Sequence, residues 1–323
     1  MPITQRQIAD ATGFSEATVS RVLSGKDNVR QEVRNQILAA ARTLEYRGLP
    51  RRVLLICETL VPSTYYATMI RELVKLLRFS DFQVEMIDRY SLSLVEERNT
   101  VGAISIASVD GLERYWGEQF SLPLVCINTK PCHLHGINCV VNDDVGGTRS
   151  MMEHLLARGH RRIGLYGWLG NPQPATQCNA NRLNAFQETI REYGGKDDLL
   201  AHRCRDEDDV CALIRGLLRQ GATAIVAEGE DNCLELVYAL GQIGCRIPED
   251  ISVVGWLPPG IRKFINPPMT GVMQNYQEIA LTAVRLLRER IRGAEPGDDQ
   301  IIPSLHVDGF STADVQEAAG TEQ

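Results

Sequence analysis

Residues 4–23, T-Q-R-Q-I-A-D-A-T-G-F-S-E-A-T-V-S-R-V-L, decide how the N-terminal part of this chain folds. Thr4 and Gln7 have the spacing of a capping box, which marks the beginning of a helix. Gly13 permits the sharp turn that ends this helix, and Ser15 is placed to cap a second one. The stretch therefore predicts a helix-turn-helix.

The second of these helices is expected to have one buried and one exposed face. Val19, Val22 and Leu23 recur at helical spacing, so we expect them to pack inward. Four residues of the first two turns are left facing outward: Glu16, Ala17, Ser20 and Arg21. Arginine can pair with guanine, and glutamate can accept a hydrogen bond from cytosine, so this face is suited to reading DNA.

The run A-T-V-S-R-V-L after G-F-S, followed by a helix expected over 29–46, resembles the DNA-binding head of the lactose-repressor and galactose-repressor family of bacterial transcription regulators. In that family the second helix lies in the major groove of operator DNA. The resemblance implies base contacts by three residues: Glu16, Ala17 and Arg21. It implies phosphate contacts by five hydroxyl residues: Thr4, Ser15, Thr18, Ser20 and Ser24.

The charge distribution agrees with DNA binding at one end. Residues 1–52 carry nine Lys and Arg against five Asp and Glu, a net of +4, whereas the whole chain carries −7. Phosphate contacts need local positive charge, so we expect only this end to contact DNA. A charge of this size predicts weak binding by one head. A homodimer would double the contacts and read a near-palindromic site.

Composition favours a cytoplasmic protein with a small head and a larger body. The chain has 323 residues, 44% of them hydrophobic, and neither a transmembrane stretch nor a signal peptide pattern, so no membrane partner is expected. Nine cysteines without a C-x-x-C pair fit a reducing compartment. One cluster could bind zinc or copper: Cys126, Cys132, His133, His135 and Cys139. Its spacing matches no familiar site, so we expect neither a metal nor a cofactor.

From Val53 onward, apolar runs alternate with amphipathic helices, the pattern of parallel sheets flanked by helices. Strands are predicted at 53–57, 84–87, 101–106 and 124–127, and a helix at 65–79. The crossover at 88–100 is near the minimum length for joining parallel strands, so its helix should be short or absent. A further helix should end at Gly159, and a strand should begin at Ile163.

Three segments of the body resemble the same family: 141–167, 247–255 and 267–272. The resemblance implies an α/β body like a periplasmic sugar-binding protein, with two lobes, a ligand cleft between them and side-by-side dimerisation. The expected division is a head at 1–46, a linker at 47–52, a body at 53–314 and a disordered tail at 315–323, with disorder beginning after Ala313. The first lobe is expected at 53–158 and 276–302, and the second at 159–275 and 303–314.

The resemblance also names candidates for binding a small-molecule effector. Asn128 and Arg182 fall at cleft positions, and three residues lie nearby: Trp168, Gln274 and Tyr276. Tyr65 or Tyr66 would face the cleft from the other lobe, although an aromatic residue at a helix start is more often part of the core. Aromatic faces, arginine and amide groups are how proteins bind polyols or carboxylates.

Two departures from the family pattern affect the cleft. Gly229 and Glu230 stand where Asn-Asp is usual, and Trp256 and Leu257 stand within the usual G-[FY]-D-D, so both Glu230 and Trp256 join the effector candidates. Leu257 replaces an aspartate that commonly binds a sugar hydroxyl. Because Arg182 remains, we expect a sugar acid, a sugar phosphate or another anionic effector in preference to a neutral sugar.

The linker departs as well, because the family normally carries a hinge helix that inserts into the minor groove. Here 47–52 reads R-G-L-P-R-R, which is too short for a two-turn helix and contains Gly48 and Pro50. We expect an extended strap whose arginines touch phosphates without kinking the operator. These are Arg47, Arg51 and Arg52.

The expected function is a transcription regulator, a repressor in the usual family pattern, controlled by an effector. A degenerate regulator that binds DNA without responding to a ligand stays open, since Gly229 and Leu257 are both losses at the cleft. An exported solute-binding protein is disfavoured by the head. A doubly wound enzyme is disfavoured because Gly164, Gly167 and Gly170 match neither G-x-G-x-x-G nor a P-loop, so no catalytic residue is assigned.

Overall fold

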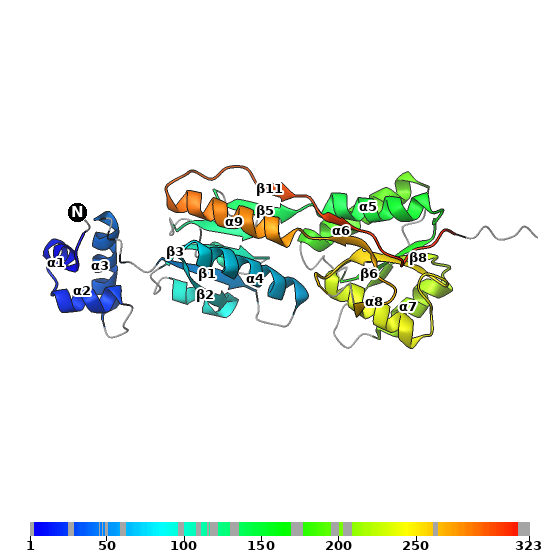
Figure 1. Ribbon diagram of the computed structural model, residues 1–323, viewed down its shortest axis with the longest axis horizontal. Coiled ribbons are helices and arrows are strands. Elements are labelled where there is room, and N and C mark those ends of the chain that lie inside the picture. The colour runs from blue at the N-terminus through cyan, green and yellow to red at the C-terminus, as the bar shows by residue number, and fades with distance from the viewer. Residues whose placement is uncertain are drawn as a thin grey trace, which may run out of the picture.

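The computed structural model describes residues 3–24, 29–44, 46, 48, 51–58, 63–95, 100–107, 111–114, 116, 122–129, 136–168, 177–194, 200–202, 209–260 and 264–315. Within these residues, a small helical head and two α/β lobes follow one another along the long axis of the molecule (Figure 1). The expected fold class is confirmed. Among the helices of this described part, none is both long and apolar enough for a membrane crossing.

The head consists of α1 (Gln5–Thr12), α2 (Glu16–Leu23) and α3 (Gln31–Thr43). The capping box at the start of α1 is present, with the Thr4 amide donating to Gln7 Oε1 at 2.9 Å. Gly13 ends α1 in the left-handed region at φ 75°, and Ser15 accepts from the Thr18 amide to cap α2. The predicted helix-turn-helix is therefore confirmed. Its core holds the expected apolar residues of α2 together with residues of α1 and α3.

The first lobe is built on a parallel sheet of the described strands in the order β11-β5-β4-β3-β1-β2. The strands are β1 (Arg52–Cys57), β2 (Gln83–Asp88), β3 (Thr100–Ile106), β4 (Leu124–Ile127), β5 (Asn138–Asn142) and β11 (Gln300–Ile302). One face is covered by α4 (Thr64–Phe79) and α9 (Tyr276–Ile291), which pack against each other. The described part of the opposite face carries the 3-10 helices η1 (Arg89–Val95) and η2 (Leu112–Arg114), so the helix expected in the 88–100 crossover is indeed short where it is described.

The second lobe has a sheet in the order β12-β10-β9-β8-β6-β7, parallel except for the antiparallel pair of β10 and β12. Its strands are β6 (Ile163–Gly167), β7 (Leu200–His202), β8 (Ala224–Ala227), β9 (Ser252–Trp256), β10 (Thr270–Met273) and β12 (Leu305–Val307). One face packs against α5 (Asp144–Ala157) and α6 (Gln177–Glu192), and the other against α7 (Val210–Arg219) and α8 (Glu230–Gln242).

In its described part the chain passes between the lobes at three places: from β5 to α5, from β10 to α9 and from β11 to β12. The expected lobe boundary at residue 158 is wrong, because α5 packs on the second sheet. Met152 and Leu155 of α5 lie in one buried cluster with Phe186 and Trp256. The helical period predicts that α5 has an apolar face, but it does not reveal which of two similar sheets that face covers.

Two other expected boundaries need correction. Arg52 is the first residue of β1 and so belongs to the body, where its Nε lies 3.4 Å from Glu85 Oε2. The tail is not disordered immediately after Ala313. The Ala313 amide donates to Ser252 Oγ at 3.0 Å, and the Val315 amide donates to the Arg158 carbonyl at 2.9 Å. The remainder of the tail, 316–323, lies outside the described residues.

Candidate functional site

The outer face of α2 presents the residues that the sequence singled out. The side chains of Glu16, Ala17, Ser20 and Arg21 are exposed, while the apolar residues of the same helix are buried beneath them. Arg6 of α1 reaches across to Glu16, with Nε and Oε1 4.0 Å apart. The first turn of α2 therefore points its polar side chains away from the head and leaves them accessible to a groove.

Several of the hydroxyls assigned to phosphates are used inside the head. Thr4 and Ser15 cap α1 and α2 through their side chains. Thr18 is half-buried and lies 2.9 Å from Ser15 through the two hydroxyl oxygens, and Ser24 Oγ donates to the Arg21 carbonyl at 3.1 Å. Such caps hold helix ends in position, and a hydroxyl oxygen retains acceptor and donor capacity beyond one bond.

The arginines of the linker contact the body where they are described. The guanidinium of Arg51 lies 4.6 Å from the centre of the Phe82 ring, and Arg52 pairs with Glu85. Arg47 lies outside the described residues, as do residues 49 and 50, so the predicted extended strap stays a prediction. Arg51 and Arg52 would have to leave these contacts with the first lobe before their side chains could reach phosphates.

A cleft of about 360 Å³ lies between the lobes, at the carboxyl ends of their parallel strands. This is where open parallel sheets place ligand sites, because loops and helix N-termini converge there. Seven of the nine expected effector residues line it: Tyr65, Tyr66, Asn128, Trp168, Arg182, Glu230 and Gln274. Both tyrosines line the cleft and also pack against the buried cluster of the first lobe, so each has a structural contact as well as a place in the lining.

The other two expected residues lie behind the cleft wall. Trp256 places its ring under the guanidinium of Arg182, with 3.9 Å between Arg182 Cζ and the ring centre. Tyr276 donates its hydroxyl proton to Glu230 Oε1. Neither belongs to the cleft lining, so both expectations of direct ligand contact are corrected to positioning roles.

The sequence analysis missed several polar residues that line the cleft: Ser63, Thr129, Cys178, Asn179, Glu228, Asp231 and Asn232. A signal for Glu228 was available, because it directly follows β8 at the carboxyl edge of the sheet. Cys178 and Asn179 lie in the first turn of α6, whose position depends on how that helix packs. No local pattern distinguishes such residues from an ordinary helix start.

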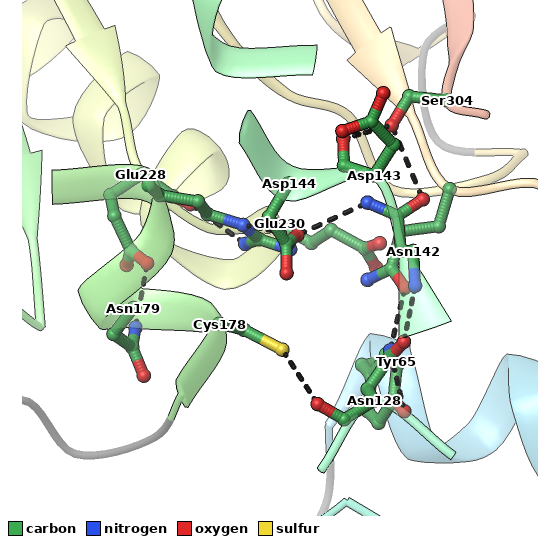
Figure 2. A network of polar contacts seen from close by, with 12 residues as sticks. Tyr65, Asn128, Asn142, Asp143, Asp144, Cys178, Asn179, Glu228, Glu230 and Ser304 are labelled. Carbon is green, nitrogen blue, oxygen red and sulfur yellow. Dashed lines mark hydrogen bonds and ion pairs between the residues drawn. The ribbon is translucent and has the colours of Figure 1, made fainter. Parts of the chain in front are cut away.

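Asn128 connects the elements of the first-lobe wall (Figure 2). It follows β4 in the left-handed region at φ 61°, and its Nδ2 donates to the Tyr65 hydroxyl at 3.0 Å and to Gln274 Oε1 at 2.9 Å. Its Oδ1 accepts from the Asn142 amide at 2.9 Å. Both amide protons are therefore committed, and Asn128 positions neighbouring side chains rather than offering a free donor to a ligand.

Arg182 is the corresponding centre of the second-lobe wall. Its side chain is buried, with Nη2 2.8 Å from Asp144 Oδ1 and Nη1 donating to the Glu228 carbonyl at 2.9 Å. Burial alone would lower the pKa of Arg182, but the charges of Asp144 and Glu228 outweigh it and hold that pKa above its ordinary value. Asp144 is the partner that a buried arginine requires. The reason for expecting an anionic ligand is thereby removed, because the positive charge of Arg182 is already matched.

Two glycines make room for this wall. A Cβ atom at Gly147 would lie 2.7 Å from the Trp256 ring, which supports Arg182. A Cβ atom at Gly167 would lie 2.5 Å from Glu228 Cβ. Because these positions carry no side chain, the Trp256 ring can pack beside α5 and the Glu228 side chain beside β6.

Carboxylates gather on the second-lobe side of the cleft. Glu228 is 1% exposed and accepts from Asn179 Nδ2 at 2.6 Å, and its burial raises its pKa against the opposing charge of Arg182. Glu230, at the start of α8, is 6% exposed. Burial raises the pKa of Glu230 to about 7, although its hydrogen bond with Tyr276 and the charge of Arg182 act in the opposite direction.

Among the described residues, three hydrogen bonds span the cleft from the first lobe to the second. Ser63 Oγ donates to Asp231 Oδ2 at 3.3 Å, and Cys178 Sγ donates to the Asn128 carbonyl at 3.3 Å. The third is the bond from Tyr276 to Glu230. Each connects a residue of the first lobe with a helix start of the second lobe. A ligand in the cleft would therefore alter the contacts that set the angle between lobes.

Part of the possible soft-metal cluster can be placed. Cys126 and Cys139 are buried and face each other in the register of β4 and β5. Cys132, His133 and His135 lie outside the described residues. Within the described ranges, no group of three or more histidine, cysteine or acidic side chains has the geometry to hold a metal ion.

Comparisons with known proteins match both parts of the chain. Residues 4–48 match the sequence model for bacterial regulatory proteins of the lacI family, and residues 152–312 match that for a periplasmic binding protein-like domain. The HTH-type transcriptional regulator reg1 of Streptomyces lividans is 27% identical over an alignment of 337 positions, gaps included, which covers 95% of each sequence.

Solved structures give the same result for the fold. A complex of the transcriptional regulator CelR with cellobiose has a TM-score of 0.70 and 25% identity, covering 96% of this chain and 99% of that one. The lac repressor dimer bound to operator and the anti-inducer ONPF has a TM-score of 0.65 and 20% identity, covering 97% and 100%. The similarity thus spans the head and both lobes.

Proposed function

Because this chain belongs to the lacI family of bacterial regulatory proteins, we propose that it is a sequence-specific DNA-binding regulator of transcription whose affinity for its operator is controlled by a small molecule in the interlobe cleft. It acts as a repressor and as a homodimer, so that two heads read a near-palindromic operator. Glu16, Ala17 and Arg21 face base edges in the major groove.

The observation that carries this proposal is the polar outer face of α2 within a complete, capped helix-turn-helix. Arg21 is exposed at the end of α2 opposite Ser15, and its neighbours Val22 and Leu23 are buried in the core of the head. A recognition helix needs this separation, since bases can be read only by side chains that the fold does not use.

The cleft supplies the second half of the proposal. Its lining residues come from both lobes, and three hydrogen bonds cross it, so a ligand bound there favours one interlobe angle over another. In a dimer, that angle sets the separation of the heads. The structures of CelR with cellobiose and of the lac repressor dimer on its operator support a ligand-controlled, dimeric regulator.

The test is DNase footprinting of the full-length protein on the DNA that flanks its own gene, at several salt concentrations. We expect a protected near-palindrome whose affinity falls steeply as salt rises, because phosphate contacts release counterions. Arg21→Ala should weaken specific binding by about tenfold or more, the effect of losing one bidentate base contact.

Arg219→Ala provides the matched control, because Arg219 is an exposed arginine in the last turn of α7, in the lobe that lies away from the head (Figure 1). It removes one positive charge far from the recognition face and should leave the footprint unchanged. Equal effects of the two substitutions, or protection of unrelated DNA with equal affinity, would contradict sequence-specific reading by α2.

A further inference from the structure

We propose that the ligand of the cleft carries a positively charged amino group, which the carboxylates of Glu228, Glu230 and Asp231 receive. This inference rests on the proposed function, since it names the ligand class of the same cleft. It concerns one wall of that cleft, the second-lobe side at the end of β8 and the start of α8.

The charges of the cleft lining do not balance. Among the lining residues that the structure describes, Arg182 is the one basic side chain; it forms its ion pair with Asp144 behind it and also attracts Glu228, so one cation faces several carboxylates. Three carboxylates remain on the lining: Glu228, Glu230 and Asp231. Carboxylates gathered in a partly buried site are stabilised by a cation and repel an anion.

Glu230 has an oxygen that no described residue satisfies. Its Oε1 accepts from Tyr276, but its Oε2 is buried and has no hydrogen-bond partner among the described residues, although the side chain is only 6% exposed. A buried acceptor without a donor is costly. An ammonium group entering the cleft would donate to this oxygen and match the carboxylate charge.

The position of these acids does not follow from helix capping alone. Acidic residues in a first turn favour the helix dipole, and this explains Asp231, which is exposed. It does not explain Glu228, which precedes α8 and is 1% exposed, nor the burial of Glu230. Both side chains point into the protein beside the cleft. An acidic side chain interacts favourably with a helix dipole while it is exposed, so capping does not explain why these two are buried.

The first-lobe wall supplies aromatic side chains to the same cavity. Tyr65 and Tyr66 line it, with ring centres 5.3 Å apart in an edge-on arrangement. Aromatic rings attract ammonium groups through their quadrupoles, and recognition of amines commonly combines such rings with carboxylates. Thr129 Oγ1 adds a buried hydroxyl without a partner among the described residues, which suits a polar rather than a wholly apolar ligand.

The experiment uses two matched sets of probes that differ in charge on one skeleton. The first set is glucosamine, glucose and glucuronate, and the second is N-methylglucamine, sorbitol and gluconate. Binding to the full-length protein is measured by calorimetry and by thermal shift at pH 7. We expect the ammonium member of at least one set to bind about tenfold or more tightly than its neutral counterpart, and the anionic members not to bind.

Variants assign the effect to the carboxylates. Glu230→Gln retains the shape of the side chain and should reduce affinity for the ammonium probe by about tenfold, with no loss for a neutral probe. Glu228→Gln should act in the same direction. Glu188→Gln, on the exposed face of α6, is the matched control for loss of one carboxylate and should have no effect. Thermal unfolding of each variant establishes that it is folded.

Failure of this inference and failure of the proposed function give different results. Tighter binding of a neutral or anionic probe, or binding of neither ammonium probe, contradicts the charged-amine ligand. If a neutral sugar then releases operator DNA in the footprinting assay, the regulator stands and only the ligand class is wrong. If the protein protects no specific DNA at all, the proposed function itself is contradicted, whatever the cleft binds.

Discussion

The two walls of the cleft are built in different ways. In the first lobe, neutral groups satisfy one another: Asn128 donates to Tyr65 and Gln274 and accepts from Asn142. In the second lobe, Arg182 is paired with the buried carboxylate of Asp144, and the nearby carboxylates of Glu230 and Asp231 have no ion-pair partner among the described residues. The comparison indicates that the first wall fixes the shape of the cleft, whereas the second wall determines which charge it accepts.

The largest effect is expected from Arg182→Leu. This substitution leaves Asp144, which is 3% exposed, buried without its cation. Removal of one partner of a buried ion pair costs about 3–5 kcal/mol, so urea unfolding should show a loss of that order. The double variant Arg182→Leu with Asp144→Asn should recover much of the loss. A single-variant loss below about 1 kcal/mol would mean that the second wall is not organised around this pair.

Removal of the Glu230 charge should stabilise the protein at neutral and higher pH. The pKa of Glu230 is raised from 4.5 to about 7 in the folded protein, so the folded state binds the extra proton between these values. The ionised carboxylate therefore destabilises the fold above pH 7, and this penalty is relieved as the pH falls toward 4.5. Glu230→Gln should be more stable than the wild type by about 3 kcal/mol at pH 8.

Denaturant midpoints between pH 5 and 8.5 measure this difference, which should shrink toward the acidic end. Glu230→Gln keeps an acceptor for Tyr276, so the comparison isolates the charge. Glu188→Gln again serves as the control for an exposed carboxylate. A pH-independent difference between wild type and Glu230→Gln would contradict the burial of an ionisable group at this position.

In the first wall, Asn128→Ala should destabilise the protein by about 2 kcal/mol. The substitution breaks three hydrogen bonds and leaves Gln274, which is 4% exposed, without its donor. Asn128→Gly sharpens the result, because glycine adopts φ 61° without steric cost. The glycine variant should be more stable than the alanine variant by about 1 kcal/mol, and both losses should be independent of pH.

The smallest effect is expected where the walls meet. Ser63 Oγ and Asp231 Oδ2 form an exposed hydrogen bond between the lobes, and Ser63→Ala should cost less than about 1 kcal/mol of unfolding free energy. Its effect should appear in the interlobe angle, measured by small-angle scattering with and without ligand. If Ser63→Ala lost as much unfolding free energy as Arg182→Leu, the main electrostatic interaction of the cleft would be the Ser63–Asp231 hydrogen bond and not the Arg182–Asp144 ion pair.

Much of the fold could be predicted from the sequence, because the signals involved are local. The capping box of Thr4 and Gln7, the left-handed Gly13 and the apolar period of α2 all act within a few residues, and the structure has each of them. Strand and helix order in the body followed from the same kind of pattern. Seven cleft residues were found through the family resemblance, which places some of them directly after strands and others in the first turns of helices.

What the sequence by itself determined is therefore the set of elements, the helix-turn-helix face and most of the cleft lining. Only the tertiary structure decided that α5 packs on the second sheet, that Asp144 pairs with Arg182, and that the hydroxyl of Tyr276 bonds to Glu230 across the lobes. The physical reason is separation along the chain. Periodicity and capping report contacts within one or two helical turns, whereas these pairs join residues 38 and 46 positions apart.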